Sequence, residues 1–138
     1  MDLEALKQAL EEKDEVLAAY LFGSAAQRDS IANDVDILLL LQPGSNKYEV
    51  EFDLKSHLAE HLGIPEKKFD FLFFEMDEAD PKILYKAIDQ GILLKNANPQ
   101  FLSERINRLS SYFLENDSMI EKAEYLRRER IEAFCEDR

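Results

Sequence analysis

The sequence has little of what holds small secreted or membrane proteins together. Cys135 is the one cysteine among 138 residues, which excludes an internal disulfide and makes the reducing cytoplasm the expected location. Its apolar runs all fall well short of the roughly 20 residues that a bilayer-spanning helix requires. The first residues, Met1 to Glu4, carry no basic stretch, so we expect no signal peptide and no membrane partner. The composition is that of a globular domain, with 46% hydrophobic and 10% aromatic residues.

Basic residues are also scarce: 17 Lys and Arg face 29 Asp and Glu, and the net charge is -12. A protein that holds nucleic acid through many phosphates needs a basic surface, so this balance argues against direct nucleic-acid binding. Acidic groups remain compatible with a phosphate substrate when they act through a bound divalent metal, which reverses the local field. The charge therefore favours a free nucleotide with a protein or small-molecule acceptor.

Apolar residues alternate between two spacings along the first two-thirds of the chain. Largely apolar runs of strand length occupy residues 16–22, 35–41, 69–74 and 92–94, and a single aspartate interrupts the second and the third. Helical spacing occupies residues 3–13, 47–62 and 83–88. Strands that are apolar on both faces and alternate with helices predict an α/β fold, a small mixed sheet covered by helices.

The best boundary in the chain lies between Asn96 and Pro99. We expect residues 1–96 to form one domain and residues 97–138 to form a two-helix C-terminal extension packed on it, with a break near residues 116–118. The extension has more aromatic residues than a small core needs, which predicts a docking surface. These aromatic residues are Tyr112, Phe113, Tyr125 and Phe134.

The most informative stretch joins Gly23-Ser24, at the end of the first predicted strand, to Asp34 and Asp36 at the start of the second. Side chains two residues apart in a strand project to the same face, so the two carboxylates should lie side by side. Such a pair repels unless something positive neutralises it, and Mg²⁺ is the natural candidate. Glycine allows the backbone to approach a phosphate closely, and Ser24 could add a hydroxyl donor. A polar strand start is the alternative reading of the carboxylates.

This combination resembles the nucleotidyltransferase fold superfamily, whose pattern is a hydrophobic residue, Gly-Ser, a short spacer and Asp-x-Asp. Within it, the chain looks most like the minimal nucleotidyltransferases, the MntA antitoxins that pair with HEPN-domain HepT toxins. The resemblance implies that Asp34 and Asp36 hold two Mg²⁺ ions and that ATP is the substrate. It also implies a third carboxylate, Asp70, which would complete the second metal site and help to deprotonate the attacking hydroxyl.

The resemblance is incomplete in the loop after Ser24. Family members often show Gly-Ser-x-Ala-x-Gly, whereas this chain keeps Ala26 and has Arg28 in place of the last glycine. The serine that is common before the first aspartate is Asn33 here. We name Arg28 as a candidate phosphate contact, with a solvated loop residue as the alternative.

The activity implied is transfer of AMP from ATP to a hydroxyl, most simply a tyrosine of a cognate HEPN toxin. Modification would silence the toxin, so the chain would act as an antitoxin and form a hetero-oligomer with its partner. Two alternatives stay open: nucleotidyl transfer to a small molecule such as an aminoglycoside, and a non-catalytic module that neutralises its toxin by contact.

His57 and His61 are four residues apart on a predicted helix, a spacing that can bind zinc. The sequence offers no evident third ligand, and both residues flank the leucine stripe of that helix. A surface pair is therefore the favoured interpretation.

Overall fold

The computed structural model describes residues 1–26, 34–115, 126, 128 and 129. Within these residues a four-stranded sheet has the order β3-β2-β1-β4. The strands are β1 (Val16–Phe22), β2 (Val35–Leu41), β3 (Phe69–Phe73) and β4 (Ile92–Asn96). β1 runs antiparallel to both of its neighbours, whereas β2 and β3 are parallel. The predicted α/β class with a mixed sheet is confirmed.

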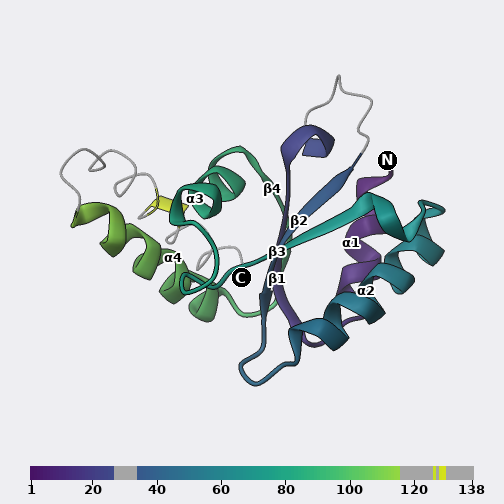
Figure 1. Ribbon diagram of the computed structural model, residues 1–138, viewed down its shortest axis with the longest axis horizontal. Helices are drawn as coiled ribbons and strands as arrows, with labels where there is room; N and C mark the ends of the chain where they lie inside the picture. Colours follow the sequence, from purple (N-terminus) through teal and green to yellow (C-terminus); the bar gives the residue numbers. More distant parts are fainter. Residues whose placement is uncertain (27–33, 116–125, 127, 130–138) are drawn as a thin grey trace.

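Helices cover both faces of this sheet, as Figure 1 shows. One face carries α1 (Leu3–Glu11) and α2 (Lys47–Leu62), and the other carries α3 (Pro81–Gln90) and α4 (Pro99–Leu114). Each helix begins after a side chain that accepts hydrogen bonds from the first free backbone N–H groups. These capping residues are Asp2, Asn46, Asp80 and Asn98.

Alternating residues of the two central strands supply the two cores. Towards α3 and α4 the strands present Ala18, Tyr20, Leu38 and Leu40. Towards α1 and α2 they present Ala19, Leu21, Ile37 and Leu39. Each of these side chains is at most 4% exposed, so both faces are closed to water. The even-numbered residues of β2 therefore point to the α3/α4 side, and Asp36 is one of them.

α4 shares its core with the sheet. Leu102, Ile106, Leu109 and Phe113 are fully buried in the cluster that contains Tyr20 and Leu38. The prediction of Phe113 as part of a docking surface is therefore wrong, because its ring fills the core and meets Tyr112 edge to face at 5.2 Å. The predicted break near residues 116–118, and with it Tyr125 and Phe134, lies outside the described residues. The division after residue 96 stays a prediction.

A search of the described residues for membrane spans finds no helix with the length and apolar character to cross a bilayer.

Candidate active site

The structure brings two of the predicted site residues together as direct neighbours in the sheet. In the parallel pairing of β2 with β3, the Cα atom of Asp36 lies opposite that of Asp70. Asp36 shares its face with Leu38, and Asp70 shares its face with Leu72, both of which belong to the α3/α4 side. The two carboxylates therefore project in the same direction from adjacent strands.

Asp34 completes the group from just outside the strand. It lies one residue before β2 begins and is exposed, as is Asp70, whereas Asp36 is half-buried. Burial raises the pKa of the Asp36 carboxyl, and the negative charges of Asp70 and Asp34 raise it further. Both carboxylates thus act on Asp36 electrostatically, which places all three at one end of the sheet.

The Gly23-Ser24 turn faces the same carboxylates. β1 ends at Phe22, whose Cα pairs with that of Asp36, and the 3₁₀ helix η1 (Gly23–Ala26) follows at once. Gly23 adopts φ +68°, a conformation that L residues rarely take. A Cβ atom at Gly23 would collide with the Asp36 carboxylate, since it would lie 3.3 Å from Cγ and closer still to Oδ2. The glycine therefore makes room for the aspartate.

This second role of Gly23 was not foreseen from the sequence, which suggested only close approach to a phosphate. A glycine at the end of a strand hints at a crowded neighbour, but nothing local identifies Asp36 as that neighbour. The backbone of Ser24 belongs to η1. Arg28 and Asn33 lie outside the described residues, so the phosphate contact predicted for Arg28 stays a prediction.

The carboxylates suit a hard divalent cation. Within residues 1–26 and 34–115, none of the ion pairs involves Asp34, Asp36 or Asp70. Three converging carboxylates without a cationic partner in that part of the chain repel one another, and this repulsion adds to the effect of burial in raising the pKa of Asp36. Oxygen ligands of this kind are what Mg²⁺ prefers, so the donor set fits the metal that the sequence predicts.

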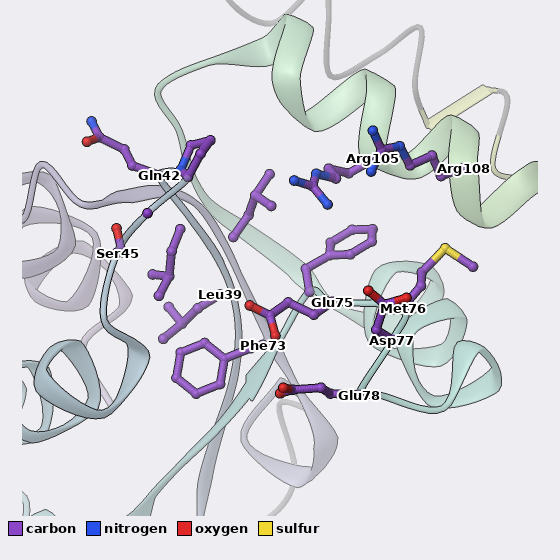
Figure 2. A pocket seen from close by; sticks show the side chains of 15 residues that line it. Leu39, Gln42, Ser45, Phe73, Glu75, Met76, Asp77, Glu78, Arg105 and Arg108 are labelled. Atoms are coloured by element: carbon purple, nitrogen blue, oxygen red, sulfur yellow. The ribbon is translucent and has the colours of Figure 1, made fainter.

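A separate cavity of about 450 Å³ lies at the opposite ends of β2 and β3. Figure 2 shows Arg105 and Arg108 of α4 on one side of it and Glu75, Asp77 and Glu78 on the other. Its walls include Leu39 to Leu41 of β2 but none of the predicted site residues. The candidate active site is therefore the exposed carboxylate group, not this cavity.

Comparisons with known proteins identify the fold and the family. No curated protein matches the chain at a significant level. Among solved structures, a chain of a toxin–antitoxin complex with AMP-PNP superimposes with a TM-score of 0.60 and 20% identity, over 88% of this chain and 97% of that one. A chain from the complex of the tri-AMPylated Shewanella oneidensis HEPN toxin with MNT antitoxin gives a TM-score of 0.53 and 19% identity, over 86% and 92%.

A chain from an MntA–HepT toxin–antitoxin crystal structure also matches, with a TM-score of 0.53 and 18% identity, over 86% of this chain and 93% of that one. At such identities the likeness establishes a shared fold. A family model, described as polymerase beta nucleotidyltransferase, matches residues 4–100, which include Gly23, Asp34, Asp36 and Asp70. The chain belongs to the polymerase beta nucleotidyltransferase family.

Proposed function

We propose that this protein transfers AMP from ATP to a tyrosine hydroxyl of a cognate HEPN toxin and thereby acts as an antitoxin. The observation that carries the proposal is the convergence of Asp34, Asp36 and Asp70 beside the Gly23 turn, with the pKa of Asp36 raised by burial and by the other two carboxylates. A carboxyl group whose pKa is shifted in this way is typical of a functional site. The cytoplasmic location expected from the single cysteine is part of the same proposal.

The transfer forms a bond between the acceptor oxygen and the α-phosphorus of ATP and breaks the bond from that phosphorus to the bridging oxygen, so that pyrophosphate leaves. Asp34 and Asp36 would hold Mg²⁺, and Asp70 would complete a second site. Bound Mg²⁺ supplies the positive charge that stabilises the triphosphate and the leaving pyrophosphate. Asp70, exposed on β3, accepts the proton of the attacking hydroxyl. Gly23 leaves the backbone of the turn free to approach the phosphates.

Two observations support the choice of nucleotide and partner. The structural relatives include one complex with AMP-PNP and one in which the HEPN toxin carries AMP groups. The shared fold extends over most of both chains in each comparison. A protein acceptor also suits the exposed position of Asp34 and Asp70, because a folded partner can present a side chain to an open site.

Incubation of the purified protein with ATP labelled at the α-phosphate, Mg²⁺ and a candidate HEPN partner tests the proposal. We expect label on a tyrosine of the toxin and loss of its RNase activity. The double variant Asp34→Ala plus Asp36→Ala should leave the toxin unlabelled and active. Asp53→Ala is the matched control, because Asp53 is an exposed aspartate on α2, and it should label the toxin as the wild type does.

Each other outcome contradicts the proposal in a recognisable way. In a parallel incubation with an aminoglycoside, label on that compound but not on the toxin would identify a small-molecule transferase. Inhibition of the toxin that survives the double variant would identify a protein that neutralises by contact alone.

A further inference from the structure

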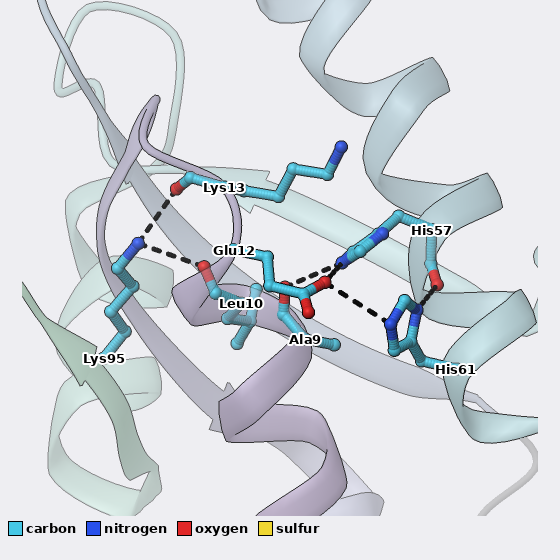
Figure 3. A network of polar contacts seen from close by, with 7 residues as sticks. All are labelled: Ala9, Leu10, Glu12, Lys13, His57, His61 and Lys95. Atoms are coloured by element: carbon cyan, nitrogen blue, oxygen red, sulfur yellow. Dashed lines mark hydrogen bonds and ion pairs between the residues drawn. The ribbon is translucent and has the colours of Figure 1, made fainter.

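Three metal-binding side chains meet between α1 and α2, away from the candidate active site. Glu12 directly follows α1, and His57 and His61 lie on successive turns of α2. The Glu12 Oε2 atom lies 3.1 Å from Nε2 of His57 and 3.4 Å from Nε2 of His61, as Figure 3 shows. Sequence spacing identified the histidine pair but not its third member, because Glu12 is distant in the chain and reaches the pair only through helix packing.

The hydrogen bonds around the pair leave a ring nitrogen of His61 with its lone pair towards Glu12. The Nδ1 atom of His61 lies 2.9 Å from the backbone carbonyl of His57, which can only accept, so Nδ1 donates there. Its Nε2 atom is then left facing the carboxylate of Glu12. The Nε2 atom of His57 lies 2.9 Å from the Ala9 carbonyl, to which a neutral ring donates its Nε2–H, and 3.1 Å from Oε2 of Glu12. A metal ion held by Glu12 and both Nε2 atoms would replace that hydrogen bond and would give the facing lone pairs of His61 and Glu12 a shared partner.

The spacing of the ligand atoms also suits a shared metal ion. Zinc binds histidine nitrogen and carboxylate oxygen at about 2.0–2.2 Å in tetrahedral geometry, which places neighbouring ligand atoms ~3.3 Å apart. The two separations from Oε2 of Glu12, 3.1 and 3.4 Å, lie on either side of that value, and all three ligand atoms lie within 4.8 Å of one another. We propose that Glu12, His57 and His61 form a site for a divalent transition metal such as zinc, which clips α1 to α2.

The ring of His61 is already oriented for this role. A metal-binding histidine ordinarily donates its other ring N–H to a carbonyl or carboxylate, which fixes the ring and its tautomer. His61 makes such a bond to the carbonyl of His57. His57 is 15% exposed and His61 40%, so the site is anchored on one side and open to a water ligand on the other.

The metal expected here differs from the one expected at the active site. Two imidazoles and a carboxylate suit zinc and its neighbours in the first transition row, whereas Mg²⁺ requires oxygen ligands. The two places are also separate. Glu12 precedes β1, the candidate carboxylates lie where β1 ends, and seven strand residues span roughly 20 Å. The clip is therefore a second site that is independent of nucleotide chemistry.

Zinc titration of the full-length, chelator-stripped protein tests the proposal, with affinity measured by calorimetry. We expect one zinc ion per chain and a higher melting temperature when zinc is present. Glu12→Gln and His61→Ala should each weaken zinc binding by at least about tenfold, since loss of even an outer partner of a metal ligand has an effect of that size. Both variants should also abolish the gain in melting temperature.

Two controls make the result specific. Glu11→Gln removes the same charge from the adjacent exposed residue and should bind zinc as the wild type does. The double variant Asp34→Asn plus Asp36→Asn should retain the zinc ion. The proposal is overturned if the wild type binds no zinc, if Glu12→Gln and His61→Ala bind it as well as Glu11→Gln, or if only the double variant loses it. Substitution with Co²⁺ gives a second readout, because its visible absorption should appear in the wild type and be absent from His61→Ala.

Discussion

The carboxylate of Asp36 occupies the space into which a side chain at Gly23 would project. The relationship joins the turn after β1 to the start of β2 through a single contact. It explains why a glycine stands at a position whose φ of +68° already disfavours other residues. The two requirements, a positive φ and room beside Asp36, can be separated experimentally. Gly63 also has a positive φ, but no neighbour would meet a side chain there.

Gly23→Ala should lose both stability and transfer activity. The left-handed backbone conformation alone costs an alanine about 1–2 kcal/mol, and the new methyl group would also displace Asp36. Gly63→Ala is the matched control, since Gly63 ends α2 with φ +67° and a Cβ there would meet nothing within 4 Å. Denaturant unfolding should show the cost of the left-handed backbone in both variants. AMP transfer should be lost in Gly23→Ala alone. Full activity in Gly23→Ala would show that the contact is unimportant.

Asp36→Asn should abolish transfer and stabilise the fold. A metal ligand contributes several kcal/mol to the transition state, so we expect the rate to fall about 1000-fold. Because the pKa of Asp36 is raised in the folded protein, the folded state binds its proton more readily than the unfolded chain does. The charged carboxylate therefore destabilises the fold above the raised pKa, and this penalty disappears as the pH falls towards the ordinary value of 3.8.

Melting temperatures measured without metal should accordingly be higher for Asp36→Asn than for the wild type at pH 8, and the difference should shrink in acid. Asp53→Asn, on the exposed side of α2, provides the reference for a simple loss of charge. A variant that melts below the wild type at pH 8 would contradict the idea that the carboxylates repel.

Asp70→Asn should separate binding from chemistry. If Asp70 takes the proton of the attacking hydroxyl, the single-turnover rate should fall by a factor of about 100 or more, the range of general-base catalysis. Binding of a non-hydrolysable ATP analogue should fall much less, because Asp34 and Asp36 remain. An equal loss in the two measurements would show that Asp70 acts only as a metal ligand.

Lys95→Met should destabilise the protein and leave transfer intact. The Lys95 side chain is buried, and its Nζ atom donates to the carbonyls of Leu10 and Lys13 at 3.0 and 2.9 Å (Figure 3). Methionine keeps the packing but leaves both carbonyl acceptors without that donor. Leaving a buried polar group unsatisfied in this way lowers the free energy of unfolding by about 1–3 kcal/mol. Denaturant unfolding measures the loss, and Lys86→Met, at an exposed lysine of α3, is the control. An unchanged free energy of unfolding would mean that water replaces the amine as the hydrogen-bond donor to the two carbonyls.

Lys95 should also make the free energy of unfolding depend on pH. Burial lowers the pKa of Lys95, and the nearby carboxylates only partly oppose that shift. The unfolded chain therefore binds this proton more readily, so the free energy of unfolding should rise between the lowered pKa and the ordinary 10.5. Lys95→Met should lack that contribution.

Local patterns predicted the elements of this fold well. The runs at 16–22 and 35–41 coincide with β1 and β2, and the leucine stripe at 47–62 coincides with α2. Such segments are set by side-chain periodicity and by nearby turn residues, which a single sequence displays. The alternation of Asp34 and Asp36 predicted a shared face for the same reason, but Asp34 lies one residue before β2 begins, so the shared face stays a prediction.

The remaining features depend on contacts between distant segments. Sequence does not encode in any local pattern that Asp70 pairs with Asp36, that Glu12 reaches the histidines of α2, or that the Lys95 amine is buried against α1. Phe113 was misassigned for a related reason, because the core area that the sheet offers to α4 is known only once the layers are assembled.

The position of β3 at the margin of the sheet has a further consequence for how an acceptor is chosen. Asp70 lies on this outermost strand, and among the described residues both it and Asp34 are exposed to water. A folded partner can therefore reach these two carboxylates without displacing another strand of the described sheet. If they are the reacting centre, swapping the surface against which the acceptor rests should redirect the enzyme while its carboxylates stay unchanged.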